Sequence, residues 1–556
     1  MSPELLAQAA WPLTVAATLP LLAYRGWRRL QLSRAKHRSL AGHSLWSKRL
    51  ARLVPGYSHS ATEWMAVDGA PEPVLHQRRT GLARLSAVLQ GRSPKTLAHT
   101  AALKEGLSDL QFTSRYRVPF AFTDAVQTQL PLGAVWAQAD GLHLTDLDGQ
   151  RHWDLTGSYG VNLFGVDFYK SCMAEGLALG NALGPVLGGY HPCVLDNVRR
   201  LRQLSGMDEV SFHMSGTEAV MQAVRLARYH TGKRHVVRFA GAYHGWWEDV
   251  QPGPGNPLPP RDTYTLADQS ERALAVLDSR CDIACVLVNP LQALHPNRNA
   301  PADGTLTHGQ RHSAFDRQAT TAWLQRLREV CTRRGIALIF DEVFMGFRLG
   351  PGGAQAHFGV QADLVTYGKT VAGGLPVGVV CGRAKWMRRF RTDRPADVCL
   401  ARGTFNAHPA VMGAMQVFLQ RLDTPAVQAM YDGADERWQA HCARFNAALA
   451  AAGLPLQAAA MGTVWTLNLL QPSRYHWMLQ FYLREAGVAL SWVGTGRFIF
   501  TLAHTADDVD RIAQCVVAAA TRMQADGWWW TPPGAPNRLG RQVLLETLRA
   551  RMGWAP

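Results

Sequence analysis

Ala362-Asp-Leu-Val-Thr-Tyr-Gly-Lys-Thr-Val-Ala-Gly-Gly-Leu-Pro376 combines a short apolar run, one lysine and a glycine-rich turn. The apolar run predicts a buried strand, and the Gly-Gly-Leu-Pro turn predicts a break after it. Lys369 therefore stands near the end of a strand, where a buried amine can form a Schiff base with an aldehyde. Because a lysine after glycine in a loop is more often a solvated surface residue, the neighbouring motifs must decide between the two interpretations.

A second motif, Leu338-Ile-Phe-Asp-Glu-Val343, places Asp341 28 residues before that lysine. Asp341 ends an apolar run, where an unpaired carboxylate costs several kcal/mol. It therefore needs a cationic or hydrogen-bonding partner. A protonated pyridine nitrogen would meet that need and would make the ring a better electron sink. A structural ion pair is the alternative.

Residues 214–228 predict a strand end, a turn of small residues and an amphipathic helix. Apolar residues recur there at the helical spacing i, i+3, i+4 and i+7, namely Val220, Ala223, Val224 and Ala227. The free N–H groups at the helix start would hold a phosphate, and the hydroxyls of Ser215 and Thr217 would add donors. A simple N-capped helix explains the same residues equally well.

Three further motifs carry side chains that suit a small-molecule site. In Gly241-Ala-Tyr-His-Gly245, Tyr243 could stack on a planar cofactor with His244 beside it, although such a pair more often only packs. Gly157-Ser-Tyr-Gly-Val-Asn-Leu-Phe-Gly165 is too rich in glycine for a helix, and loops of this composition often line sites. A plain turn is the alternative there, and Thr404 by itself marks an ordinary turn.

Strands alternate with helices through the middle of the chain. Strands are predicted over residues 210–214, 235–239, 284–288, 336–340 and 364–367, and helices over residues 217–230 and 320–334. This alternation predicts an α/β domain with a mostly parallel sheet. In such sheets ligands bind at the carboxyl ends of the strands, which is where the motifs fall.

Composition and charge indicate which kind of protein this is and which partners it would bind. The chain has 556 residues, of which 47% are hydrophobic and 18% charged, so it is globular and long enough for two or three domains. Its nine cysteines form no disulfide or zinc pattern, so no metal site is predicted and a reducing compartment is indicated. Residues 1–100 hold 14 Lys/Arg and four Asp/Glu, which gives +10 of the net charge of +16. This concentration favours an anionic membrane surface over nucleic acid.

The apolar segment that precedes these basic residues is 5–24, which contains no charged residue. Its length is about the minimum for a membrane-spanning helix, although prolines at positions 12 and 20 weaken it. By the positive-inside rule, the basic cluster from Arg25 to Arg38 would keep the rest of the protein on the cytoplasmic side. The alternative is an amphipathic helix that lies on a membrane or docks on the protein itself.

Six segments are expected along the chain. They are a possible membrane anchor (1–40), an extension of unknown role (41–111), the start of a small domain with a substrate loop (112–165), a large domain (166–409), the α+β remainder of the small domain (410–525) and a tail (526–556). Two strands joined at Asp148-Gly149 predict a hairpin near the start of the small domain. The tail, with Trp528-Trp-Trp530 and a helix predicted over residues 541–551, suits a dimer contact or a second membrane-facing patch.

Together these motifs resemble a known family. From about residue 112 to 520 the chain is similar to class III, fold-type I aminotransferases that depend on pyridoxal 5'-phosphate (PLP). Within that class it resembles the glutamate-1-semialdehyde aminomutase branch, and most of all the aminotransferase domains of polyketide and peptide synthases. The resemblance rests on Gly160-Val-Asn-Leu-Phe-Gly165, Ser215-Gly-Thr-Glu-Ala-Val220, Phe239-Ala-Gly-Ala-Tyr-His-Gly245, Asp341-Glu-Val343, Gly346-Phe-Arg348, Gly352-Gly-Ala-Gln-Ala356, Tyr367-Gly-Lys369, Gly373-Gly-Leu-Pro-Val-Gly378, Gly403-Thr-Phe405 and His408-Pro409.

The resemblance implies a fold and a role for each catalytic residue. The fold would have a mostly parallel sheet of the seven-stranded type in the large domain and a smaller α+β C-terminal domain. Lys369 would form the Schiff base with PLP and shuttle a proton. Asp341 would pair with the pyridine nitrogen, and Tyr243 would stack on the ring with His244 beside it.

Further residues would bind the cofactor phosphate and the substrate. The resemblance gives the phosphate to Ser215, Gly216 and Thr217. It also implies a homodimer, in which Thr404 reaches the phosphate of the neighbouring subunit. The loop residues near the substrate would be Ser158 and Tyr159.

One motif departs from the family pattern. Many class III enzymes carry a Glu-Pro pair at the strand before the aspartate strand, where this chain has Asn289-Pro-Leu-Gln292. A neutral amide at that position argues against a substrate role borrowed from those members, but it does not affect the expectation of a bound cofactor.

One function and two alternatives are predicted. The chain would transfer an amino group from a small amino donor to an aldehyde or ketone of a lipophilic, fatty or polyketide-derived intermediate in secondary metabolism, at the cytoplasmic side of a membrane. The first alternative is an aminomutase that shifts an amino group within one small molecule and needs no external donor. The second is a catalytically silent, membrane-associated scaffold, against which the presence of Lys369, Asp341 and Tyr243 argues.

Overall fold

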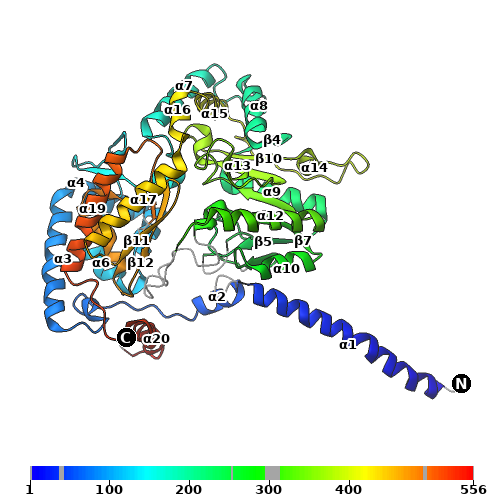
Figure 1. Ribbon diagram of the computed structural model, residues 1–556, viewed down its shortest axis with the longest axis horizontal. Helices are drawn as coiled ribbons and strands as arrows, with labels where there is room; N and C mark the ends of the chain where they lie inside the picture. The colour runs from blue at the N-terminus through cyan, green and yellow to red at the C-terminus, as the bar shows by residue number, and fades with distance from the viewer. Residues whose placement is uncertain are drawn as a thin grey trace.

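The structure, a computed structural model, describes residues 3–36, 43–251, 255–258, 260–294, 313–491 and 497–554, without the side chains of residues 3–17, 44, 45 and 535–537. A large domain surrounds the main sheet, a smaller domain lies beside it, and an N-terminal extension wraps the smaller domain (Figure 1). The N-terminal helix α1 projects away from this body.

A mixed sheet of seven strands forms the centre of the large domain. Its β10 is antiparallel to both of its neighbours, β4 and β9, whereas the pairs from β9 to β6 are parallel. The predicted mostly parallel sheet is thereby confirmed, with two strands, β6 and β10, that the sequence pattern did not indicate. The strand order is β4 (Glu209–His213), β10 (Gly378–Gly382), β9 (Leu364–Gly368), β8 (Ala337–Asp341), β7 (Ile283–Val288), β5 (His235–Phe239) and β6 (Thr263–Leu266).

Helices cover both faces of this sheet, which explains why its central strands are apolar on both sides. Ile339 belongs to the apolar cluster formed with α9 (Gly216–Thr231). Its neighbour Leu338 belongs to the other cluster, with α10 (Glu271–Ser279) and α12 (Arg317–Arg334). Alternate residues of one strand therefore pack against different helices, and the strand is buried throughout.

The smaller domain contains two small sheets. One is β1 (Gln138–Asp140), β2 (His143–Thr145), β3 (Arg151–Asp154) and β13 (Val488–Ala489); the other is β11 (Leu456–Met461), β12 (Val464–Leu469) and β14 (Arg497–Ile499). The predicted hairpin is present, because β2 and β3 pair antiparallel on either side of Asp148-Gly149. Since β13 pairs with β3, residues from two distant parts of the chain share one sheet.

Further helices complete the two domains. Those of the smaller domain are α17 (Ala434–Ala451), α18 (Leu479–Glu485) and α19 (Ala506–Ala525), with the short η7 (His476–Met478). The others are η4 (Gly157–Gly160), α7 (Val166–Gly180), α8 (Cys193–Ser205), η5 (Pro290–Leu294), α13 (Gly353–Phe358), η6 (Lys369–Ala372), α14 (Ala384–Met387), α15 (Pro409–Arg421) and α16 (Pro425–Tyr431).

The extension packs on the smaller domain and on the tail. It consists of α2 (Ser44–Ala51), η2 (Glu63–Ala66), α3 (Glu72–Arg92), α4 (Pro94–Gly106) and α5 (Ser108–Arg115), followed by η3 (Phe120–Phe122) and α6 (Thr123–Gln129). Trp64 stacks on Trp528, with ring centroids 5.2 Å apart, and the buried Arg78 donates to Gly527 O at 3.0 Å. Two of the three tail tryptophans, Trp528 and Trp529, are therefore core residues and not a surface patch.

The N-terminal helix α1 (Pro3–Ala35) ends beside the edge strand of the large sheet. Lys36 forms an antiparallel bridge with Leu266, and Ala267 N donates to Ala35 O at 3.0 Å. In the part of the chain that the structure describes, no helix is long and apolar enough to cross a bilayer. The membrane-spanning interpretation of residues 5–24 therefore finds no support, and the side chains of residues 5–17 lie outside the described part.

Candidate active site

The predicted site residues lie at one edge of the seven-stranded sheet. Asp341 is the last residue of β8 and pairs in register with Thr366 of β9, which Lys369 follows three residues later. Ser215 comes two residues after β4, and His244 lies in the loop that follows β5. Because these strands are parallel, their carboxyl ends meet at the same edge of the sheet.

Asp341 and His244 form a buried hydrogen-bonded pair. His244 Nδ1 lies 2.7 Å from Asp341 Oδ2, and neither side chain is more than 4% exposed. Burial lowers the pKa of His244, against the opposing effect of the Asp341 hydrogen bond and charge. Its Nδ1–H donates, because a carboxylate can only accept. The other oxygen, Asp341 Oδ1, accepts from Val343 N and Thr366 Oγ1, both at 3.2 Å, and the carboxylate is thereby fixed in one orientation.

Lys369 is a mostly buried amine whose charge interacts with that of Asp341. Burial lowers the pKa of Lys369; the Asp341 charge opposes this and the Arg348 charge adds to it. Its Nζ lies 5.5 Å from the centroid of the Phe344 ring. A lowered pKa increases the neutral fraction of the amine, which is the form that attacks a carbonyl. The structure does not place Lys369 on the solvated surface.

Three predicted site residues have a left-handed backbone, which non-glycine residues rarely adopt. The φ angles are +52° at Lys369, +46° at Ser158 and +55° at Tyr159. Such strain clusters where a side chain must be held in one place. A Cβ on the intervening Gly160 would lie 2.7 Å from the Phe344 ring and 3.3 Å from Lys369 Cδ. The predicted substrate loop therefore packs directly against the lysine.

The helix start predicted to hold a phosphate opens at the same edge of the sheet. Ser215 is the N-cap of α9, and its Oγ accepts from Glu218 N at 3.2 Å. The N-capped alternative is thus correct for the Ser215 side chain, and the first N–H groups of the helix have no acceptor within it. Gly216 and Gly378 must be small, because a Cβ would lie 2.6 Å from Val343 Cγ1 and 1.9 Å from Ser215 O, respectively.

Asn289, the residue that differs from the expected family pattern, contacts Tyr243. Asn289 Nδ2 donates to Tyr243 O at 3.1 Å, and Asn289 Oδ1 accepts from Leu291 N at 3.1 Å. Both ends of the amide are therefore used, and Asn289 is 7% exposed. The Tyr243 ring is 62% exposed, and burial and the Asp341 charge both raise the pKa of its hydroxyl. The amide of Asn289 thus holds the Tyr243 loop.

Thr404 does not join the other predicted residues within one chain. It is exposed, and among the described residues no interaction connects it with them. Its surroundings are exposed and apolar: Phe405 is 51%, Leu400 75% and Tyr190 70% exposed. Arg402 Nη2 donates to Gly188 O at 3.5 Å, which joins the two loops that carry these side chains.

Sequence reasoning missed several residues that shape the site. Phe344 packs on Lys369 and Gly160, and Thr366 orients Asp341. Arg348, quoted only as part of a motif, is 5% exposed and donates to Thr463 Oγ1, Phe500 O and Asn162 O at 2.7, 3.0 and 3.1 Å. Burial lowers its pKa to about 10. The one signal in the sequence for a buried Arg348 was that the five residues before it and the residues directly after it contain no acid.

These residues fit PLP by their chemistry. The buried carboxylate of Asp341, oriented by His244, suits a protonated pyridine nitrogen. The Lys369 amine suits the aldehyde carbon, and the start of α9 suits the phosphate. Within the described residues, His244 Nε2 is buried and has no hydrogen-bond partner, so this ring is not fully satisfied by the protein alone.

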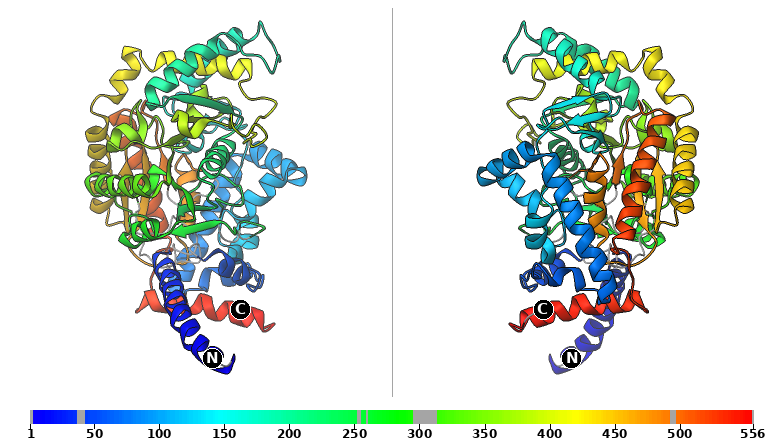
Figure 2. Two further views of the ribbon diagram at one scale, coloured as in Figure 1. Left: turned by 90° about the vertical axis from the view of Figure 1, so that its right-hand side faces the viewer. Right: turned by 90° about the vertical axis from the view of Figure 1, so that its left-hand side faces the viewer.

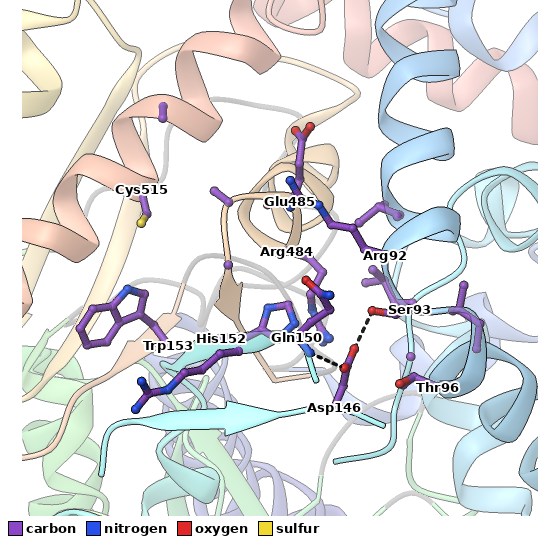
Figure 3. Close-up of a pocket in the computed structure, with 18 of the residues that line it drawn as sticks. Arg92, Ser93, Thr96, Asp146, Gln150, His152, Trp153, Arg484, Glu485 and Cys515 are labelled. Carbon is purple, nitrogen blue, oxygen red and sulfur yellow. Dashed lines mark hydrogen bonds between the residues drawn. The ribbon is translucent and has the colours of Figure 1, made fainter. Parts of the chain in front are cut away.

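A separate cavity of about 650 Å³ lies between the extension and the smaller domain (Figure 3). Arg92, His152, Trp153 and Arg484 line it, and none of the predicted site residues does. Both ring nitrogens of His152 are buried without a partner among the described residues, and burial lowers its pKa to about 4. The extension of unknown role thus forms one wall of a second cavity, which is distinct from the sheet edge.

Comparisons with known proteins identify the family. A family model, aminotransferase class III, matches residues 124–248 and 316–519. Glutamate-1-semialdehyde 2,1-aminomutase from Desulfotalea psychrophila is 33% identical over 348 residues, which cover 59% of this chain and 74% of that protein.

Two solved structures have the same fold. One, a transaminase with PLP bound, is 26% identical with a TM-score of 0.60, over 71% of this chain and 92% of that one. The other, β-phenylalanine aminotransferase from Variovorax paradoxus, is 25% identical with a TM-score of 0.62, over 79% of this chain and 96% of that one. With the family model matched over more than half of its length, the chain belongs to the class III aminotransferases and is a PLP-dependent enzyme of fold type I.

Proposed function

We propose that this enzyme transfers an amino group from a small amino donor to an aldehyde or ketone of a lipophilic intermediate, as a step of secondary metabolism. The observation that carries the transamination is Lys369, a mostly buried amine of lowered pKa next to the hydrogen-bonded pair of Asp341 and His244. Two aromatic side chains among the predicted site residues, Tyr159 and Tyr243, are exposed and support an apolar substrate.

The arrangement of polar groups supports the same substrate class. Arg348, the cation whose charge reaches Lys369, is already bound to three neutral oxygens and is not available to a substrate carboxylate. Asn289 supplies a neutral amide where many relatives have a carboxylate, and both of its ends are occupied. A neutral, apolar acceptor fits these surroundings better than a small dicarboxylate does.

Each of the chain's own site residues would have a separate role in the reaction. PLP, when bound, supplies an electron sink for negative charge at the substrate carbon. Lys369, with its lowered pKa, would take the proton from that carbon and would deliver it to the former aldehyde carbon of the cofactor. Asp341 holds a negative charge opposite the ring nitrogen, and His244 keeps that carboxylate in place. The Ser158–Tyr159 loop, packed near the lysine through Gly160, would lie beside the substrate.

An aminomutase is the second candidate, because the relative at 33% identity carries that name. The two candidates differ in one requirement. A transaminase needs a separate amino donor in each cycle, whereas an aminomutase shifts the amino group within one molecule and turns over without a donor.

We also propose that the active form is a homodimer in which Thr404 of the second copy reaches the phosphate. The exposed apolar side chains Phe405, Leu400 and Tyr190 around Thr404 support this, because monomeric soluble proteins rarely expose such groups together. A location at the cytoplasmic side of a membrane remains part of the proposal, supported by the basic residues that follow segment 5–24.

The first experiment is an absorbance spectrum of the PLP-loaded protein before and after addition of single amino donors. We expect the visible band of PLP bound to Lys369 to disappear with one donor and to return with the acceptor. Lys369→Ala should lack the band, whereas Lys385→Ala, a change of an exposed lysine, should keep it. A protein that shows no response to any donor but rearranges an amino aldehyde would be an aminomutase.

The acceptor class is tested with a series of straight-chain aldehydes of increasing length. Each buried CH₂ contributes about 0.8 kcal/mol, so kcat/KM should rise up to about fourfold per added CH₂. A preference for short, charged acceptors over the long-chain ones would refute the lipophilic assignment and leave the transaminase chemistry intact.

A further inference from the structure

Two helices near the N-terminus and one near the C-terminus lie at the same end of the molecule. They are α1, α2 and α20 (Ala535–Arg551), and Figure 2 shows α1 and α20 at the lower end in both views. Arg551 Nη1 donates to Leu53 O at 3.4 Å, so α20 contacts the segment that follows α2. We call residues 18–36, 46–54 and 538–554 the basal face.

Helix α20 presents its apolar side to the solvent. Leu544, Leu545 and Leu548 are 60%, 52% and 46% exposed, and Met552, one turn further, is 55% exposed. The opposite side carries Glu546, which is 12% exposed and accepts from Arg474 and from Tyr57. A surface helix of a soluble protein normally buries its apolar stripe and exposes its charges. The reversed arrangement in α20 provides an outer surface for contact with an apolar phase.

The same reversal occurs in α2. Trp46, Leu50, Leu53 and Val54 recur at spacing i, i+4, i+7 and i+8 and are 40–60% exposed, whereas Ser47 is buried. Apolar residues at that spacing form one continuous stripe.

Helix α1 is exposed on all sides where it leaves the body. Residues 18–27 are all exposed, and they include Leu19, Leu22, Tyr24 and Trp27. The basal face therefore contains outward apolar side chains from all three helices.

Positive charge surrounds these apolar side chains. The basal face contains 12 Lys/Arg and a single acidic residue, Glu546, which is already bound to Arg474. Within the described residues, none of Arg25, Arg29, Arg49 and Arg52 takes part in an ion pair. Helices with Leu and Trp on one side and Lys and Arg beside them lie in the interface of membranes, where the cations contact anionic headgroups. We infer that the basal face binds the surface of a membrane that contains anionic lipids.

A lipid surface fits these features better than other partners do. A second copy placed on this face would bring two strongly positive surfaces together, which like-charge repulsion opposes. Nucleic acid would use the cations but would leave the leucine stripe of α20 exposed to water. The apolar surface around Thr404 is a different one and is available for dimerisation. The inference deepens the proposed location and does not rest on the identity of the amino donor or acceptor.

The test is sedimentation of the full-length, PLP-loaded enzyme with vesicles. One set is phosphatidylcholine alone, and the other is phosphatidylcholine and phosphatidylglycerol at roughly 2:1, so that the surface is negative. Binding to the second set should be at least about tenfold tighter and should weaken at high salt. Leu544→Asp/Leu548→Asp should lower the partition at least about tenfold, because two apolar contacts are lost and negative charge is added.

The matched control is Leu103→Asp/Leu107→Asp, two exposed leucines at the same i, i+4 spacing on and directly after α4. These changes should leave vesicle binding unaltered. Equal binding to both vesicle sets, or no loss in Leu544→Asp/Leu548→Asp, would overturn the inference. So would a fall in particle mass by light scattering in that variant, because the face would then be a contact between copies. Binding is measured without turnover, so failure of the proposed chemistry does not affect the result.

Discussion

Glu342→Gln tests whether the buried side chain of Glu342, which follows Asp341 in the chain, is protonated at neutral pH. Glu342 is 1% exposed, and its Oε2 accepts from Ala354 N at 2.7 Å. Burial raises its pKa from an ordinary value of 4.5 to about 8, the hydrogen bond from Ala354 N opposes this, and the Asp341 charge adds to it. At pH 7 Glu342 therefore keeps its proton.

The sign and size of the effect follow from linkage. A carboxyl whose pKa is higher in the folded than in the unfolded protein releases its proton more readily on unfolding. The contribution of Glu342 to the free energy of unfolding is therefore complete below about pH 4 and is lost as the pH rises through about 8. Between pH 6 and pH 9 the loss amounts to about 3 kcal/mol. Glutamine stays neutral throughout, so Glu342→Gln should gain about that much relative to the wild type over this interval.

The assay is urea unfolding at several pH values from 6 to 9, with the free energy of unfolding extrapolated to water. Glu329→Gln, a change of an exposed glutamate on α12, serves as the control and should follow the wild type. If the free energy of unfolding of Glu342→Gln depends on pH as that of the wild type does, Glu342 does not carry its proton at neutral pH. That result would refute the raised pKa of Glu342.

Three further changes test the site and its support. Asn289→Ala removes the donor to Tyr243 O, and the Kd for PLP should rise about tenfold in a titration of the apoenzyme, with smaller changes in kcat at saturating PLP. Arg348→Met breaks three buried hydrogen bonds, and calorimetry should show a loss of about 3 kcal/mol or more; an unchanged Tm would mean that those contacts are not formed. Thr404→Val should weaken PLP binding about fivefold in the dimer, and equal PLP affinity would exclude a contribution of this hydroxyl from the second copy.

Several strands and helices could be predicted from the sequence because their apolar residues follow a clear local pattern. The strand predicted over residues 235–239 coincides with β5, since a short apolar run there lies between polar residues and a glycine turn. The site could be anticipated for the same reason. The motifs of Ser215, Asp341 and Lys369 come at or directly after the ends of β4, β8 and β9, and strands that run in the same direction place their carboxyl ends together.

Other features depend on tertiary contacts that no local pattern contains. Strand β10 begins at Gly378, next to a glycine-rich turn, and its antiparallel direction is set only by pairing with β4 and β9. The hydrogen bonds of Arg348 reach residues from three distant segments of the chain. Burial of Trp528 depends on stacking with Trp64, more than 400 residues earlier, which composition cannot show. The domain boundaries and the roles of the site residues stay predictions.

The junction between α1 and the large sheet has a practical consequence. Strand β6 is the outer strand of the seven, and an uncovered edge offers unpaired N–H and C=O groups to strands of other molecules. Ala35 and Lys36 occupy part of that edge through their contacts with Ala267 and Leu266. A truncation designed to remove the projecting helix should therefore stop before Ala35. Cutting after Lys36 would expose the backbone of β6, and the shortened protein would then aggregate through this edge.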